Sequence, residues 1–505
     1  MNGITQAIEA LSQQRIQGMR RGVEKESLRA LSSGGVAMTP HPQALGSALT
    51  HPRITTDFCE SQVELITGVH ADVQACVDEL TQIQQVTTRA LGEEMLWASS
   101  MPCGLPADDQ IPIGQYGSSN VGRTKSTYRM GLGYRYGRRM QTISGIHYNW
   151  SIPDVSSDAY FGLIRNFRRN AFLLLYLFGA SPAVCSSFVA GRSHQLQSLT
   201  DHTMYLPYAT SLRMGRLGYQ SDAQASLAVS YNSLNGYGDS LQDALTRPYP
   251  AYEAIGVQGP DGQYRQLATS LLQIENEFYG SIRPKRVIFP GERPLHALRE
   301  RGVEYVEVRL MDLDPFETVG ISGQTMRFLD VFLLHCLLSE SPLDSPAEIT
   351  ALAHNQHRVA ERGREPGLML ARGDRMVALQ DWAGEILAEL RPIAARMDAE
   401  HHTHDYGVAL AAALHGLHNP QTLPSARVLQ AVQDEHNGSF VAFVRAQSAK
   451  IKQDMLSAPL EPTIAQRFAQ MAQASWDDQR AVEAADRLPF EAYLKDYLDP
   501  RRLVP

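Results

Sequence analysis

Acidic side chains recur at alternate positions in two segments of the chain. Residues 21–29, RGVEKESLR, place Glu24 and Glu26 two positions apart, and residues 303–314, VEYVEVRLMDLD, carry Glu307 between apolar neighbours. Side chains at positions i and i+2 share one face of a strand roughly 7 Å apart, so these acids would repel one another in a partly dry site. Because bound divalent cations remove that repulsion, the spacing favours a metal site.

Two further segments offer ligands of the same kind. Residues 142–152, TISGIHYNWSI, put His147 and Asn149 on one side of a predicted strand. Residues 54–68, ITTDFCESQVELITG, add three carboxylates, Asp57, Glu60 and Glu64. A set of carboxylates with a single imidazole favours a hard ion such as Mg²⁺ or Mn²⁺ over zinc, and Mg²⁺ normally accompanies nucleotide phosphates. For any one pair of acids, the alternative interpretation is a solvated strand face.

Phosphate binding would depend on basic side chains. The sequence contains neither a GxxxxGK[ST] loop nor a strand–GxGxxG–helix unit, so no phosphate-binding loop of these types is available. Residues 282–286, IRPKR, and Arg309 are the candidates, because guanidinium groups match phosphate oxygens and lysine supplies a point charge. For IRPKR taken alone, an exposed basic turn is the alternative.

Tyrosines and small polar residues are concentrated in three segments, residues 115–145, 207–219 and 274–286. Tyrosine rings with an arginine nearby can enclose a small amino acid, since the rings shape the pocket and the guanidinium holds a carboxylate. The alternative for each segment taken singly is ordinary packing. The three segments together predict an amino-acid site beside the metal site.

Several strands with one charged face and one apolar face describe an antiparallel sheet, with helices packed behind it and a ligand site in front. We therefore predict an α+β fold in which residues 1–330 contain the catalytic sheet and its helices. Residues 331–505 are rich in Ala, Leu, Gln, Glu and Arg at helical spacing. No linker rich in Pro, Gly or Ser separates the two parts, so we expect the helical part to pack on the sheet within one structural unit.

The overall charge excludes two classes of partner. A net charge of -8 and a pI near 6.1 give no attraction to nucleic acid or to anionic membrane surfaces. The longest apolar run, residues 171–180, is far shorter than the ~20 residues that cross a bilayer. The N-terminus has no apolar core of an export signal.

The cysteines are few and scattered. The chain has five, an odd number without a CxxC pair, which suggests neither a zinc site nor a secreted disulfide framework. We therefore expect a reducing cytoplasm. Cys185 is interpreted as a buried small thiol and not as a nucleophile, because no histidine partner is indicated. The HHTH tract at 401–404 is interpreted as a surface loop between helices.

These segments resemble a known family in both content and order. The motifs are RGVEKESLR, HPQALGSALTHPRITTDFCESQVELIT, SSMPCG, QYGSSNVGRTKSTYRMGL, MQTISGIHYNWS, LFGASPAVCSSF, PYATSLRMGRLGY, LQIENEFYGSIRPKR and GVEYVEVRLMDLDPF. They closely resemble the glutamate-cysteine ligases of the proteobacterial type, from about residue 15 to 330. The resemblance implies a sheet-based funnel like that of glutamine synthetase, with metal ions between ATP and the two amino acids.

The resemblance also implies a role for each matching position. The metal ligands would be Glu24, Glu26, Asp57, Glu64, His147 and Glu307. The ATP side would comprise Asn149, Arg283, Lys285, Arg286 and Arg309, with Glu307, Lys285 and Arg309 acting in catalysis. The cysteine pocket would be lined by Tyr128, Leu132, Gln141, Tyr219 and Tyr279, and Arg213 would contact an amino-acid carboxylate. The disulfide-bearing loop of some members has no counterpart, because no cysteine follows Cys336.

The implied activity is ATP-dependent joining of the glutamate γ-carboxylate to the cysteine amine through a γ-glutamyl phosphate, the first step of glutathione biosynthesis. It would require Mg²⁺ or Mn²⁺, and the enzyme would be a cytoplasmic monomer. Two alternatives stay open on the sequence alone. One is a ligase that uses another amine on the same machinery, and the other is a non-catalytic protein that binds nucleotide or amino acid.

Overall fold

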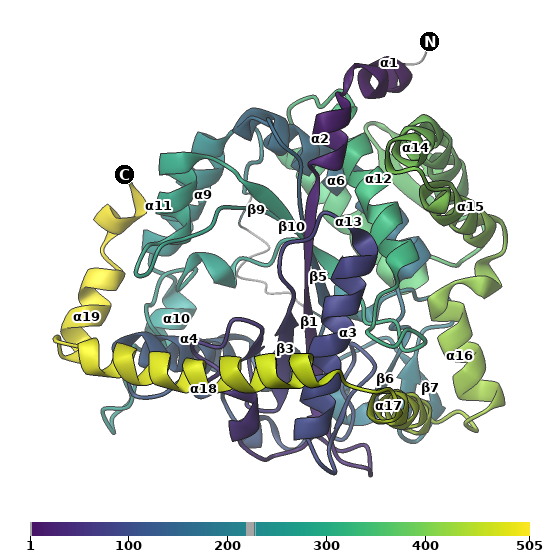
Figure 1. Cartoon of the computed structure of the whole chain (residues 1–505). Helices are drawn as coiled ribbons and strands as arrows, with labels where there is room; N and C mark the ends of the chain where they lie inside the picture. Colours follow the sequence, from purple (N-terminus) through teal and green to yellow (C-terminus); the bar gives the residue numbers. More distant parts are fainter. Residues whose placement is uncertain (1–2, 219–226, 228) are drawn as a thin grey trace.

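A seven-stranded antiparallel sheet lies at the centre of the computed structural model, which describes residues 3–218, 227 and 229–505 (Figure 1). The strands follow the order β2–β3–β1–β5–β10–β9, and β4 pairs with the end of β1. Their bounds are β1 (Arg20–Ala30), β2 (Ile54–Thr56), β3 (Gln62–Ile66), β4 (Met95–Leu96), β5 (Ile146–Ser151), β9 (Ile282–Lys285) and β10 (Tyr305–Met311). The predicted antiparallel sheet is confirmed.

Two small sheets and many helices surround this sheet. The small sheets contain β6 (Ala183–Cys185), β7 (Gln197–Thr200) and β8 (Thr203–Tyr205), and β11 (Met369–Arg372) and β12 (Arg375–Ala378). The helices are α1 (Gly3–Ala10), α2 (Gln13–Gln17), α3 (Val73–Ala90), α4 (Asn120–Tyr136), α5 (Arg138–Gln141), α6 (Ser157–Phe178), α7 (Ser186–Val189), α9 (Leu234–Thr246), α10 (Pro250–Ile255), α11 (Pro294–Arg301), α12 (Gly323–Leu338), α13 (Pro346–Arg362), α14 (Leu379–His401), α15 (Asp405–His418), α16 (Pro424–Asp434), α17 (Phe440–Ser457), α18 (Pro462–Ala485) and α19 (Phe490–Tyr497). In the described part of the chain, none of them combines the length and apolar character that crossing a membrane requires.

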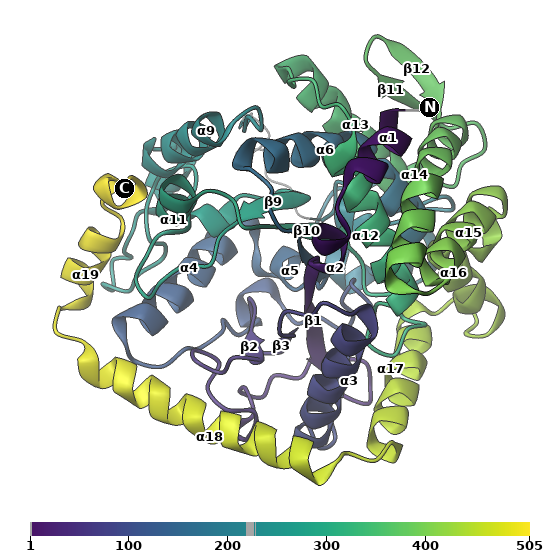
Figure 2. The same ribbon diagram turned by 45° about the horizontal axis from the view of Figure 1, so that its top comes forward.

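One face of the sheet is apolar and buried. Tyr148 and Trp150 of β5, and Val306 and Val308 of β10, are at most 1% exposed. Helix α3 packs on β1 and β3, α6 packs on β9 and β10, and α12 packs against both helices (Figures 1 and 2). The alternation of β5 and β10 therefore leaves their polar residues on the opposite face, as predicted.

Short polar residues fix where the helices beside the sheet begin. The hydroxyl of Ser119 accepts a hydrogen bond from the Gly122 N–H at 3.1 Å and caps α4. The hydroxyl of Ser156 accepts one from the Ala159 N–H at 3.2 Å and caps α6. Each cap satisfies an N–H group that the first helical turn leaves without a partner, so the start of each helix is specified locally.

A buried ion pair joins the back of the sheet to α12. Nη2 of Arg21 in β1 lies 3.1 Å from Oδ2 of Asp330 in α12, and both side chains are 0% exposed. The hydroxyl of Tyr148 in β5 donates to Oδ1 of the same aspartate at 2.7 Å. Because neither charge reaches water, each depends on the other for compensation.

The helical part of the chain packs on the sheet region without a break. Helix α12 spans the position of the boundary expected near residue 330, and the β11–β12 hairpin interrupts the helices that follow. Phe172 of α6 contacts Trp382 of α14, with ring centroids 4.5 Å apart. One core cluster contains residues of the sheet, α6, α12 and α14.

The last two helices form an arm, α18 and α19, that runs along the outside of the molecule (Figure 2). Oγ of Ser475 accepts a hydrogen bond from the Ser47 N–H at 2.9 Å. Oε1 of Glu483 accepts one from the Ser118 N–H at 2.8 Å, directly before α4. This C-terminal arm therefore ties the loop around residue 47 to the start of α4.

Two cysteines are joined, contrary to the sequence-based expectation. Cys103 and Cys185 form a disulfide across 82 residues, whereas Cys59, Cys76 and Cys336 are free and buried. The interpretation of Cys185 as a buried thiol is wrong, because its partner lies far away in sequence and no spacing rule could indicate it. The cysteine pattern therefore gives no argument for a reducing compartment.

We expect thiol titration to detect this disulfide. The unreduced protein should expose three reactive thiols after denaturation and five after reduction, and the native protein should react slowly, since burial raises the pKa of Cys59 to about 12 and that of Cys76 to about 11. Quantitative labelling with a chromogenic disulfide reagent measures this. Five thiols without reductant would contradict the pairing.

Candidate active site

The polar face of the sheet brings the predicted acids together through strand register. Glu26 of β1 pairs with Glu64 of β3, Glu24 pairs with His147 of β5, and Glu307 of β10 pairs with Asn149 of β5. Cross-strand partners lie within side-chain contact, and like charges directly opposite one another are unfavourable. The register thus confirms the shared faces of β1, β5 and β10, and it brings acids of β1, β3 and β10 together around β5.

The four carboxylates Glu24, Glu26, Glu64 and Glu307 are called the acid row below. His147 lies at its middle. Its Nδ1 is 3.1 Å from Oε2 of Glu24 and 3.8 Å from Oε1 of Glu307, and its Nε2 is 3.5 Å from Oε1 of Glu26. Asn149 donates from Nδ2 to Oε1 of Glu24 at 2.8 Å. One imidazole therefore contacts three carboxylates from two other strands.

Two cations compensate the far end of the acid row. Nζ of Lys285 lies 3.4 Å and Nη1 of Arg309 lies 3.1 Å from the same oxygen, Oε1 of Glu307. Burial would raise the pKa of Glu307, but these two cations and His147 outweigh it and hold the pKa well below its ordinary value. Glu307 is therefore ionised and fixes both basic side chains.

The other acids differ in protonation. Burial, with the nearby Asp57, raises the pKa of Glu26 to about 7. Burial and the charges of Glu24, Asp57 and Glu26 raise the pKa of Glu64 well above its ordinary value. Burial also acts to raise the pKa of Glu24, but its hydrogen bond to His147, together with the charges of His147 and Lys285, holds the pKa below the usual range. When Glu26 and Glu64 are both ionised, their surroundings therefore do not fully compensate their charge.

The donor set of this site fits a hard divalent cation. Ligand atoms of Glu24, Glu64 and His147 all lie within 4.8 Å of one another. Among the described residues, Oε2 of Glu307 and Oδ1 of Asn149 are buried acceptors without a hydrogen-bond partner. Buried oxygens of this kind, next to carboxylates whose charge is not compensated, could act as ligands of Mg²⁺ or Mn²⁺.

Helix α4 presents two cations to the acid row that the sequence reasoning did not select. Lys125 and Arg129 are four residues apart. The charge of Arg129 acts to lower the pKa of Glu64, and the charge of Glu64 acts to raise the pKa of Lys125. Nε of Arg129 also donates to the carbonyl oxygen of Asp57. Burial and the neighbouring Arg129 lower the pKa of Lys125 to about 8. Their i, i+4 spacing in the KSTYR segment was the available signal.

The three basic residues of IRPKR have different environments. Lys285 meets Glu307, as described. Arg283 is 7% exposed and donates from Nη2 to the carbonyl oxygen of Asn276 at 2.8 Å. Arg286 donates from Nε to the carbonyl oxygen of Gly302 at 2.8 Å, before β10. Only Lys285 of the three contacts the acid row through a hydrogen bond or ion pair described here.

Two of the predicted amino-acid residues, Gln141 and Tyr279, are in direct contact. Gln141 donates from Nε2 to the hydroxyl of Tyr279 at 2.7 Å, and the ring of Tyr136 meets that of Tyr279 edge-on at 5.6 Å. Tyr128 and Leu132 lie on α4, one partly and one fully buried. Tyr219 lies outside the described residues, so its predicted role stays a prediction.

Arg213 is buried between the acid row and the end of β10. It is 1% exposed and donates from Nη2 to the carbonyl oxygen of Arg309 at 2.8 Å. A Cβ on Gly145 would lie 2.1 Å from that nitrogen, so only glycine leaves room for the guanidinium. The Gly145 N–H in turn donates to Oε2 of Glu26 at 2.7 Å. The backbone of Gly145 thus lies between the Arg213 guanidinium and Glu26 of the acid row.

Glu60, the remaining acid of the 54–68 segment, is not part of the acid row. Its Oε1 accepts a hydrogen bond from the His41 N–H at 3.0 Å, and its Oε2 accepts one from the Gln115 N–H at 2.9 Å. Both bonds hold loops in place. A carboxylate that binds two backbone N–H groups cannot be told from a metal ligand by residue type alone.

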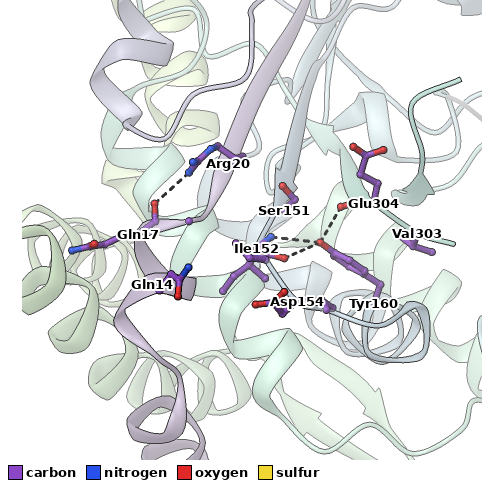
Figure 3. A pocket seen from close by; sticks show the side chains of 12 residues that line it. Gln14, Gln17, Arg20, Ser151, Ile152, Asp154, Tyr160, Val303 and Glu304 are labelled. Carbon is purple, nitrogen blue, oxygen red and sulfur yellow. Dashed lines mark hydrogen bonds between the residues drawn. The ribbon is translucent and has the colours of Figure 1, made fainter. Parts of the chain in front are cut away.

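A separate cavity of about 710 Å³ lies where β1 begins and β5 ends (Figure 3). Figure 3 shows Arg20, Ser151 and Glu304 at its rim and Tyr160 below them, with the Tyr160 hydroxyl donating to the Glu304 carbonyl oxygen at 3.1 Å. None of its lining residues belongs to the acid row. The cavity therefore lies outside the acid row.

The chain is similar to known proteins of one family over almost its full length. A family model described as glutamate-cysteine ligase matches residues 5–359. A glutamate–cysteine ligase of Alcanivorax borkumensis is 47% identical over 502 residues, covering 95% of both chains, and one of Pseudomonas aeruginosa is 46% identical over 494 residues, covering 94% of this chain and 93% of its own.

Solved structures give the same result. The crystal structure of a glutamate–cysteine ligase from Francisella tularensis in complex with AMP superposes with a TM-score of 0.91 at 36% identity, covering 95% of this chain and 97% of its own. A bifunctional glutathione synthetase from Pasteurella multocida matches with a TM-score of 0.70 at 25% identity, over 94% of this chain and 57% of its own. Fold, site geometry and relatives lead to one conclusion: the chain belongs to the glutamate-cysteine ligase family.

Proposed function

We propose that the chain joins the γ-carboxylate of glutamate to the amino group of cysteine at the expense of ATP, giving γ-glutamylcysteine. The observation that carries this proposal is the acid row, in which carboxylates of three strands converge around His147 of a fourth, with Lys285 and Arg309 beside them. A site that only binds a nucleotide would not require so many like charges in contact. The matched names of the relatives point to the same substrates.

The carboxylates and His147 would hold the cation that ATP chemistry needs. Glu24, Glu26, Asp57, Glu64, His147 and Glu307 are the proposed ligands of Mg²⁺ or Mn²⁺. When bound, the cation would neutralise charge on the ATP phosphates. The Francisella relative, solved in complex with AMP, supports nucleotide binding by this chain.

Activation of glutamate would take place at the Glu307 end of the row. A free carboxylate is a poor electrophile, so its γ-oxygen first attacks the γ-phosphorus of ATP, the bond to the leaving ADP oxygen breaks, and γ-glutamyl phosphate forms. Lys285 and Arg309, both held by Glu307, stabilise the charge that spreads over the transferred group. Asn149 and Arg309 belong to the same ATP side, whereas Arg283 and Arg286 act there by holding the adjoining loops.

The second step would use the tyrosine-lined side of the site. The cysteine amine attacks the acyl carbon through a tetrahedral intermediate, and inorganic phosphate leaves. Gln141 and Tyr279, joined by their hydrogen bond, would fix the cysteine, with Tyr128 and Leu132 completing the wall. Because γ-glutamyl phosphate is open to hydrolysis, these side chains also exclude water. We further propose that the enzyme acts as a cytoplasmic monomer.

A coupled assay tests this function directly. ADP release should require glutamate, cysteine and a divalent cation together, and mass spectrometry should detect γ-glutamylcysteine. The same assay with ammonia, alanine, serine and 2-aminobutyrate in place of cysteine measures amine selection. ADP release that is equally fast without any amine, or faster with another amine than with cysteine, would refute the proposal.

Removal of the Tyr279 hydroxyl is expected to affect cysteine most. In Tyr279→Phe, Gln141 loses its partner at 2.7 Å, so we expect the KM for cysteine to rise about 3- to 10-fold, the value of one neutral hydrogen bond, with smaller changes for ATP and glutamate. Steady-state kinetics with each substrate varied in turn measures this. Tyr134→Phe, at an exposed tyrosine of α4, is the matched control. Equal increases for all three substrates would contradict a local role.

A further inference from the structure

Asp312, directly after β10, joins three segments in the interior. Its Oδ2 accepts hydrogen bonds from the Ala180 N–H at 2.8 Å and from the Ser181 hydroxyl at 2.6 Å. Its Oδ1 accepts one from the Ser211 hydroxyl at 3.0 Å and lies 3.9 Å from Nη1 of Arg213. The side chain is 0% exposed. Both oxygens of this carboxylate therefore accept hydrogen bonds.

These contacts surround the arginine that faces the acid row. Arg213 is held on one side by Asp312 and on another by the carbonyl oxygen of Arg309 at 2.8 Å. Gly145 allows the guanidinium to lie against the backbone that binds Glu26. A long, flexible side chain with about 2 kcal/mol of rotamer entropy is thus confined to one position before any substrate arrives.

The position of Arg213 suits one substrate group. Glutamate must place its γ-carboxylate near Lys285 and Arg309 for phosphorylation. Its α-carboxylate lies a few carbon atoms away along the same molecule. Arg213 is hydrogen-bonded to the carbonyl oxygen of Arg309 and lies beside the peptide that binds Glu26, which favours its pairing with that α-carboxylate, whereas the Tyr279 side is left for cysteine.

We propose that Asp312 is a positioning residue that fixes the Arg213 guanidinium for the α-carboxylate of glutamate. This rests on the function proposed above. Asp312 contacts no acid of the row and touches no proposed reacting atom, so its effect passes through Arg213. Without the carboxylate, Arg213 would lose the charge of Asp312 beside it in a buried place, and Ser181 and Ser211 would lose their acceptor.

Kinetics of three variants test this role. In Asp312→Asn, which keeps the shape and loses the charge, the KM for glutamate should rise at least about 10-fold, while the KM values for ATP and cysteine change less than about twofold. Ser181→Ala removes only one hydrogen bond to Asp312 and should raise the KM for glutamate by about two- to fivefold. Asp330→Asn, at the buried aspartate behind the sheet, should leave all three KM values unchanged.

Each outcome decides the proposal. A rise confined to glutamate in the first two variants, graded between them and absent in Asp330→Asn, supports it. Equal rises for all substrates, a rise for cysteine alone, or an unchanged KM for glutamate overturns it. Circular dichroism at the assay temperature confirms that the variants are folded, and Ser181→Ala decides the question if Asp312→Asn does not fold. Failure of the wild-type chain to release ADP with glutamate and cysteine would instead refute the proposed function.

Discussion

Glu26→Gln is expected to remove almost all ligase activity and yet to make the metal-free protein more stable. Glutamine keeps the acceptor for the Gly145 N–H but removes one negative charge from the acid row. Turnover should fall by about 10²–10³-fold at saturating Mg²⁺, because electrostatic stabilisation of the transferred phosphoryl group depends on an intact ligand set. The same charge is unfavourable in the absence of metal, so its removal should stabilise the fold.

The sign of the stability effect follows from protonation. The pKa of Glu26 is raised by burial, then by Asp57, from 4.5 to about 7 in the folded protein. Between these values the folded state holds more protons than the unfolded state, so stability falls as pH rises through this window and the full penalty is present above pH 7. Glutamine lacks that penalty. The expected gain for metal-free Glu26→Gln near pH 8 is about 1–3 kcal/mol, and it should disappear near pH 4.5.

Urea unfolding in the presence of EDTA measures this gain, and ADP release measures the loss of activity. Glu304→Gln is a suitable control, since Glu304 precedes β10, is partly exposed and pairs with Arg286 outside the acid row. The control should change neither quantity by much. If Glu26→Gln kept wild-type turnover, or if it destabilised the metal-free protein at pH 8, the assignment of Glu26 to a strained metal site would be wrong.

Asp330→Ala is expected to cost about 3–5 kcal/mol of folding free energy, the usual result of leaving one charge of a buried pair without its partner. Arg21 is 0% exposed in its side chain, and the Tyr148 hydroxyl would lose its acceptor as well. The change lies on the apolar face of the sheet, away from the acid row. Specific activity of the folded fraction should therefore be retained at low temperature.

A double replacement separates lost packing from lost charge compensation. Arg21→Met with Asp330→Leu removes both charges and keeps most of the volume, and it should recover most of the stability lost in Asp330→Ala. Chemical denaturation of the wild type, Asp330→Ala and the double variant measures this. If the double variant were as unstable as Asp330→Ala, a role of the ion pair beyond mutual neutralisation would be indicated.

The sequence predicted the acid row because period-two alternation is a local property. Glu24 and Glu26 lie two positions apart in β1, His147 in β5 and Glu307 in β10 alternate with apolar residues, and the structure places all four together on one face. The register between strands is a long-range property that alternation does not contain. For that reason the pairing of Glu26 with Glu64 was not predicted.

Other parts of the site depend on contacts that residue types cannot indicate. Glu60 had the chemistry of a ligand, but it binds backbone N–H groups of two loops. Asp312 had no motif of its own, and its role is visible only once Ser181, Ser211 and Arg213 are seen around it. The Cys103–Cys185 disulfide joins positions 82 residues apart, which no spacing rule connects.

The C-terminal arm has a consequence for biosynthesis. Residues near the end of the chain reach back to earlier elements, since the carbonyl oxygen of Leu503 accepts a hydrogen bond from Arg299 of α11 at 3.0 Å and Glu483 holds the backbone before α4. A ribosome adds about 5–20 residues per second, so the strands with the acid row emerge many seconds before this arm. A nascent chain that has emerged as far as β10 would therefore carry the acid row before the arm can tie the loop around residue 47 to the start of α4.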